Sequence, residues 1–210
     1  TGDECAGGSY IAQPPVHPMA GLSALQSTDL SPVFERVDTG TDGVGVIEFW
    51  GIWLTNETTP APCSPANDLG LEVQYVDNTS LGSALDTDIT IPAGRFLVPE
   101  TPVASGSFTA PNGDPAPMYR YAFVPETAAD LNGWVSVQQK DATDQECRFY
   151  WVESTTFGSN SAVRWAGVGN SAVPQVKNMS LCIGLTPVPT ISSCSRSEER
   201  RVGKECRSRW

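Results

Sequence analysis

Histidine is nearly missing from this sequence, and the common motifs that depend on it are missing too. His17 is the only histidine among 210 residues, and it lies in a Pro-flanked segment. The sequence contains no GxSxG motif and no CxxC pair. A Ser–His–Asp or Cys–His mechanism needs an imidazole as general base, and structural zinc sites are built mainly from Cys and His. The sequence therefore argues against nucleophilic hydrolysis and against a zinc site.

Long apolar runs and helical periodicity are also scarce. No apolar run approaches the roughly 20 residues that cross a bilayer, so direct membrane insertion is not expected. Gly (19) and Pro (17) are abundant, and apolar residues occur in short stretches between turn-forming residues. We predict an all-β domain, an antiparallel two-layer β-sandwich of the jelly-roll kind with about ten strands.

Basic residues are few, and nearly half of them lie in the last fifteen positions. The chain has 13 Lys and Arg against 24 Asp and Glu, and residues 196–210 hold six of the former and three of the latter. This segment, RSEERRVGKECRSRW, is the one-frame translation of a common sequencing-library adapter, so we interpret it as non-native. Residues 1–195 then carry 7 basic and 21 acidic residues, a net charge of −14. Such a charge disfavours nucleic acid as a partner.

Alternating and β-branched stretches predict the individual strands. Residues 43–54 read as a central strand covered on both faces, in which Gly51 marks a bulge or a close backbone approach. Residues 71–76 alternate cleanly and predict a half-buried strand with Glu72 and Gln74 facing solvent. The remaining candidates are residues 33–38, 89–91, 95–98, 103–109, 118–124, 133–138, 147–154, 162–167 and 178–185.

Turn signals separate these strands. Residues 39–43 (TGTDG) and residues 131–133 (LNG) predict turns, and residues 112–114 (NGD) predict a hairpin. Residues 125–131 are the one stretch typical of a short helical turn.

Five cysteines remain outside the final segment, and few Lys accompany them, which indicates an oxidising compartment. Two disulfides chosen from five cysteines allow fifteen arrangements. The favoured bridge is Cys63–Cys147, because Cys63 lies in a Pro-rich loop that a disulfide would restrain, and the second is Cys5–Cys182. Cys194 would be unpaired.

The composition divides the chain into four parts. Residues 1–32 are expected to form coil or a capping arm, residues 33–186 the sandwich, and residues 187–195 a Pro/Thr/Ser linker. Residues 196–210 are the adapter-derived tail. This organisation is typical of one module from a longer exported protein, with neighbouring domains of the same parent chain as partners.

The order of several short motifs resembles a group of secreted β-sandwich modules of environmental bacteria. The motifs are a WG strand at Trp50 and Gly51, then GWVSVQ, CRFYW and a closing SLCIGL, within residues 33–186. The sequence departs from the group at Arg148, where an aromatic residue is usual, and at Asn178 and Met179, where an acidic pair is usual. The resemblance implies a secreted sandwich and carries no catalytic residues with it.

Exposed aromatic residues are the candidate ligand-binding groups. Flat aromatic faces stack on sugar rings, and alternation places Trp50 and Trp53 on opposite faces of one strand. We predict Trp53, Trp165 and Tyr75 as ligand-contacting residues, whereas Trp134 and Trp151 are expected in the core.

Carboxylates offer two further hypotheses. Asp141, Asp144 and Glu146 crowd one segment and could hold a structural calcium ion, although Asp also favours turns for local reasons. No other cofactor is expected. A glycoside hydrolase would need two close carboxylates, for which the strand residues Glu48, Glu72 and Glu153 are candidates.

The sequence thus predicts a non-catalytic extracellular module with an adhesive or structural role. A carbohydrate-binding module that uses exposed Trp and Tyr is the alternative, and a glycoside hydrolase is the second. Polysaccharide or another cell-surface component is the expected ligand.

Overall fold

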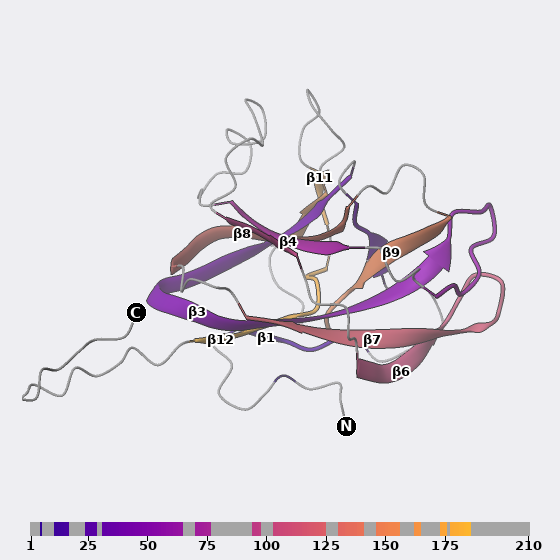
Figure 1. Cartoon of the computed structure of the whole chain (residues 1–210), viewed down its shortest axis with the longest axis horizontal. Coiled ribbons are helices and arrows are strands. Elements are labelled where there is room, and N and C mark those ends of the chain that lie inside the picture. The colour runs from indigo at the N-terminus through magenta and orange to yellow at the C-terminus, as the bar shows by residue number, and fades with distance from the viewer. Residues whose placement is uncertain are drawn as a thin grey trace, which may run out of the picture.

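The computed structural model describes residues 5, 11–16, 24–28, 31–64, 70–76, 94–97, 103–124, 130–140, 146–155, 162–164, 173–175 and 177–185 (Figure 1). These residues form twelve strands and no helix. The strands are β1 Ile11–Gln13, β2 Ala24–Gln26, β3 Val33–Thr55, β4 Leu71–Val76, β5 Gly94–Leu97, β6 Val103–Thr109, β7 Pro115–Phe123, β8 Asp130–Gln139, β9 Cys147–Val152, β10 Ala162–Arg164, β11 Val173–Pro174 and β12 Leu181–Leu185.

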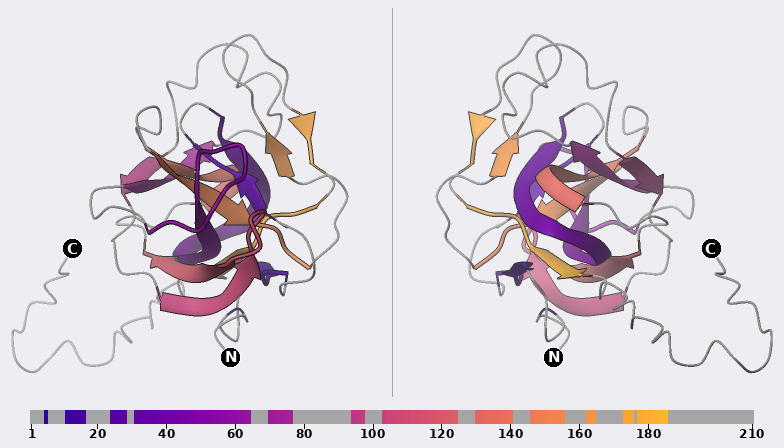
Figure 2. Two further views of the ribbon diagram at one scale, coloured as in Figure 1. Left: turned by 90° about the vertical axis from the view of Figure 1, so that its right-hand side faces the viewer. Right: turned by 90° about the vertical axis from the view of Figure 1, so that its left-hand side faces the viewer.

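Strand β3 joins the two layers of the fold. Its first part, Phe34 to Asp38, pairs with β8, and its second part, from Val44 onward, pairs with β12, β7 and β9. The register with β8 shifts between Asp38 and Gly43. Both views in Figure 2 show β3 curving from one layer into the other. The turn expected at residues 39–43 is therefore wrong. The glycines there accommodate an irregularity inside one long strand instead of reversing the chain.

The β4–β8 layer contains the first part of β3 with β8, β4 and β5, and β10 and β11 on the other side of β3. The β7–β9 layer contains the second part of β3 with β12, β1, β7, β6, β9 and β2. Every pairing between these strands is antiparallel. The predicted all-β, two-layer sandwich is confirmed.

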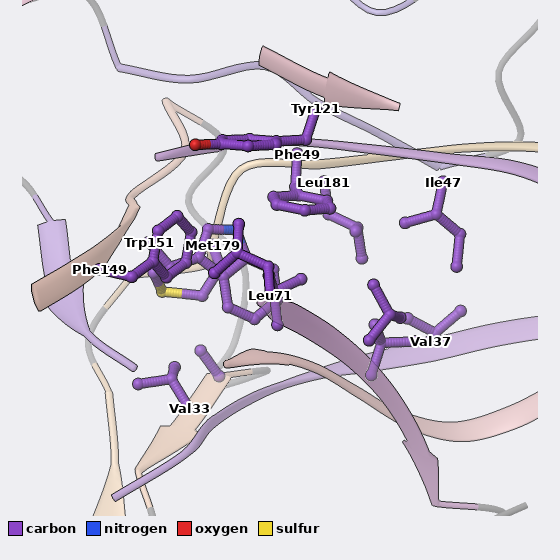
Figure 3. Close-up of a cluster of buried hydrophobic side chains, with 14 of the residues drawn as sticks. Val33, Val37, Ile47, Phe49, Leu71, Tyr121, Phe149, Trp151, Met179 and Leu181 are labelled. Atoms are coloured by element: carbon purple, nitrogen blue, oxygen red, sulfur yellow. The ribbon is translucent and has the colours of Figure 1, made fainter. Parts of the chain in front are cut away.

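The main hydrophobic core lies between the layers (Figure 3). Val33, Val37 and Leu71 enter it from the β4–β8 layer, while Phe49 and Tyr121 enter it from the β7–β9 layer. The rings of Phe49 and Tyr121 stack with centroids 5.1 Å apart, and Phe149 meets both edge to face. Such pairs stabilise the core beyond the area that they bury.

A second hydrophobic cluster covers the outer face of the β7–β9 layer. Trp50 and Ile52 of β3 pack there with Met118 of β7 and Phe108 of β6. The predicted Cys5–Cys182 disulfide is present and pins the beginning of the chain to this cluster. β3 is thus covered on both faces, as its composition indicated.

Residues 1–32 are not all coil. β1 pairs with β12, and β2 pairs with β9, so this arm supplies strands to the edges of the β7–β9 layer. Local composition missed them because each is only three residues long and depends on a distant partner.

The hairpin predicted at residues 112–114 is confirmed, with Gly113 at φ 90° and its N–H donating to the Ala110 carbonyl.

The turn predicted at residues 131–133 is wrong, since these residues belong to β8, where Gly133 pairs with Val37 of β3. Long-range pairing overrides the local turn preference here. The helical turn expected at residues 125–131 is wrong at its end, because Asp130 and Leu131 begin β8, while residues 125–129 lie outside the described residues. Residues 89–91, Cys194, residues 187–195 and residues 196–210 also lie outside them.

Gly51 marks a close approach, one of the two predicted possibilities. A Cβ atom at this position would lie 2.0 Å from Cε2 of Phe149, whose side chain is fully buried. The phenyl ring therefore packs directly over the backbone of β3.

We expect Gly51→Ala to lower the free energy of unfolding by about 1–3 kcal/mol, because the wedged ring of Phe149 has to shift. Chemical denaturation of the single variants and of Gly51→Ala/Phe149→Leu measures this. A smaller side chain at position 149 should recover part of the loss in the double variant, whereas additive losses would contradict the proposed contact.

Candidate functional site

The aromatic ligand site predicted from the sequence is wrong at Trp53. The side chain is only 2% exposed, its ring packs on Phe149, and its Nε1–H donates to the Tyr121 hydroxyl at 2.8 Å. Burial raises the pKa of the Tyr121 phenol well above its ordinary value, so the hydroxyl stays protonated. Because both faces of β3 are covered, alternation sends Trp50 and Trp53 into two different cores rather than to solvent.

The structure does not test the other two aromatic candidates, because it describes neither Trp165 nor the side chain of Tyr75. Trp165 lies outside the described residues. The backbone of Tyr75 lies in β4, paired with Val135 and Gly94. Trp134 and Trp151, expected to be buried, are buried.

The three strand carboxylates point to separate cationic partners. Glu48 forms an ion pair with Arg120, which lies 6.0 Å from the centroid of the Trp50 ring. Nζ of Lys177 lies 2.8 Å from Oε2 of Glu153. In the β4–β8 layer, Nζ of Lys140 lies 3.9 Å from Oε1 of Glu72. Glu48 and Glu72 face away from each other across the sandwich, so they do not form the close pair that glycoside hydrolysis requires.

Two of the three residues proposed to bind calcium are not among the described residues. Asp141 and Asp144 lie outside them, and Glu146 is exposed, with its carbonyl accepting from the Asn56 N–H at 2.8 Å. Among the described residues, no three acidic, Cys or His side chains form a group able to hold a metal ion.

The outer face of the β4–β8 layer carries a row of buried polar side chains. In β8, Val135 and Val137 point into the main core, so Trp134, Ser136 and Gln138 share the opposite, outer face. In β4, Glu72 and Gln74 share that face, because Leu71 and Val73 point inward. The register places Gln74 beside Ser136, and Glu72 beside Gln138. We call these five residues the polar row.

Burial makes the polar row unusual. Trp134 is 7% exposed, Ser136 is 0% exposed, and the other three members are also buried. The prediction that Glu72 and Gln74 face solvent is therefore wrong. The amide of Gln138 donates to Oε1 of Gln74 at 3.1 Å, which ties β8 to β4 across this face.

Two hydrogen-bond donors in the polar row lack a partner. Within the described part of the chain, Nε1 of Trp134 and Oγ of Ser136 are buried without a hydrogen bond. A buried unsatisfied donor costs roughly 1–3 kcal/mol. On the other outer face, Oε2 of Glu48 is also buried without a partner. By contrast, the indoles of Trp53 and Trp151 both donate at 2.8 Å.

Charged residues flank the polar row. Arg36 of β3 pairs with Trp134 in the register and is exposed, and Lys140 follows Gln138 on the same face with 47% of its side chain exposed. The alternation of GWVSVQ in the sequence was the signal that could have revealed this face, since its two valines leave Trp, Ser and Gln on one side.

The second predicted disulfide, Cys63–Cys147, is also present and ties the loop after β3 to the start of β9. Two disulfides fit an oxidising, extracellular environment.

None of the described residues forms a helix long and apolar enough to cross a membrane. Comparison with protein-family models, with curated proteins and with solved structures finds no match for the chain.

Two fully buried serines give a test of the unsatisfied donor. Ser27 Oγ accepts the Val33 N–H at 3.1 Å, whereas Ser136 Oγ has no partner. We expect Ser27→Ala to lower the free energy of unfolding by about 1–3 kcal/mol, and Ser136→Ala to leave it unchanged or raise it by up to about 1 kcal/mol. Equilibrium denaturation of both variants measures the difference. Equal losses would show that Ser136 is satisfied in the native protein.

Proposed function

We propose that the chain is a non-catalytic extracellular module of a larger exported protein with a role in surface adhesion. The observation that carries this proposal is the pair of disulfides, Cys5–Cys182 and Cys63–Cys147, which hold a two-layer sandwich together.

The arrangement of the carboxylates supports a role without catalysis. Glycoside hydrolysis needs an acid and a second carboxylate on either side of the scissile bond. Here Glu48, Glu72 and Glu153 each face a different basic side chain. The two disulfides support secretion, because bridges of this kind persist in oxidising compartments.

A retention assay tests the proposed function. The full chain is incubated with insoluble polysaccharides and with washed cell envelopes, and bound protein and released reducing sugar are measured together. We expect retention without release of sugar. Sugar release that is lost in Glu48→Gln, Glu72→Gln or Glu153→Gln would replace the proposal with a hydrolase, and neither retention nor release would leave only a spacer role.

A further inference from the structure

The tip of the β6–β7 hairpin carries an exposed Asn–Gly pair. Asn112, Gly113 and Asp114 are all exposed, and they connect β6 and β7, which lie side by side in Figure 1. Glycine has no Cβ atom to shield its backbone nitrogen, so this nitrogen can reach the side-chain amide of the preceding asparagine. We propose that Asn112 is a site of spontaneous deamidation, which converts it into aspartate and isoaspartate.

The reaction needs only the chain and water. The backbone nitrogen of Gly113 gives its proton to solvent and bonds to Cγ of Asn112. The bond between Cγ and Nδ2 then breaks, and Nδ2 takes up a proton and leaves as ammonia. Water adds to one of the two carbonyl carbons of the resulting succinimide and opens the ring, which yields aspartate or isoaspartate.

The contacts of Asp114 favour attack at Cγ. The backbone N–H of Asp114 donates to Oδ1 of Asn112 at 3.1 Å, and Nδ2 of Asn112 donates to Oδ2 of Asp114 at 2.7 Å. Oδ1 becomes negatively charged when Cγ is attacked. A backbone N–H that already points at this oxygen stabilises the transition state, as the donors of an oxyanion hole do.

One hydrogen bond of the turn slows the reaction. The Gly113 N–H donates to the Ala110 carbonyl at 2.9 Å, so the nitrogen can attack only after this bond opens. The turn is exposed, and a Cβ atom at Gly113 would meet no heavy atom within 4 Å, so there is space for this opening. We expect deamidation to be about 2–10-fold slower in the folded protein than in the unfolded chain, because the net contribution of one such bond is small.

A second Asn–Gly pair, Asn132 and Gly133, serves as an internal comparison. Both residues lie inside β8, where Asn132 pairs with Asp38 and Gly133 pairs with Val37, and Gly133 is buried. Paired strands of a core sheet open far more rarely than an exposed turn. Asn132 should therefore stay intact as long as the protein is folded.

Deamidation would replace an attractive contact at the hairpin tip with a repulsive one. The amide nitrogen of Asn112 that donates to the Asp114 carboxylate gives way to a carboxylate oxygen. Two like charges then face each other across the turn. The hydrogen bond from the Ala110 N–H to the Asp114 carbonyl, which closes the hairpin at 2.8 Å, should open more often as a result.

Peptide mapping by mass spectrometry tests the site. The full chain is incubated at mildly alkaline pH, both folded and in denaturant, and the peptides with Asn112 and Asn132 are followed for the mass increase that replacing –NH₂ by –OH brings. We expect the increase at Asn112 alone in the folded protein, and at both residues in denaturant. An Asn112 that stays intact in the folded protein but reacts in denaturant would overturn the proposal, and so would equal rates at Asn112 and Asn132 in the folded protein.

Matched variants test the mechanism and its consequence. Asn112→Gln should not react, because the longer side chain disfavours ring closure. Asn112→Asp, which creates one product of the reaction, should speed hydrogen exchange of the Ala110 amide about 2–5-fold, and Asn112→Asp/Asp114→Asn should restore the slower rate. The same mass increase in Asn112→Gln would assign the modification to another residue, and unchanged exchange in Asn112→Asp would contradict the repulsion.

Discussion

The fold depends on a single strand that belongs to two layers and is covered on both faces. β3 runs for 23 residues, pairs with β8 in one layer and with β7, β9 and β12 in the other, and shifts register between them. Its alternate side chains supply both hydrophobic clusters, which explains why Trp50 and Trp53 are both buried. The buried carboxylate of Glu35 adds a polar link from this strand, because it accepts the Met179 N–H at 2.9 Å and a bond from Gln13 at 3.3 Å.

The two outer faces of the sandwich then differ in chemistry. The outer face of the β7–β9 layer carries an apolar cluster held by the Cys5–Cys182 bridge, and it also buries the Glu48 carboxylate beside Arg120. The outer face of the β4–β8 layer buries amides, a carboxylate, a hydroxyl and an indole, and the Gln138 amide donates to Gln74 across its two strands.

The sequence predicted the features that depend on local pattern. Fold class, the central strand, the hairpin at Gly113 and the close approach at Gly51 all follow from strand alternation and glycine placement. Both disulfide pairs were also expected. The errors arise where pairing with distant strands determines the local structure. Residues 39–43 continue β3 instead of forming a turn, and Gly133 lies in β8 and pairs with Val37 of β3. Glu72 and Gln74 are buried, although the alternation of their strand is typical of one with a solvent-exposed face. The exposure of Trp53 could not be judged without knowing which face of β3 points into the main core and that a second cluster covers the other face.

The central claim is that the Trp134 indole N–H donates no hydrogen bond in the free protein. Its proton chemical shift in ¹⁵N-edited NMR spectra tests this directly, because hydrogen bonding deshields an indole proton and an unbonded one resonates upfield. Trp53 and Trp151, which both donate at 2.8 Å, serve as internal references. The account predicts a Trp134 indole proton clearly upfield of both references. A Trp134 resonance as far downfield as those of Trp53 and Trp151 would contradict it.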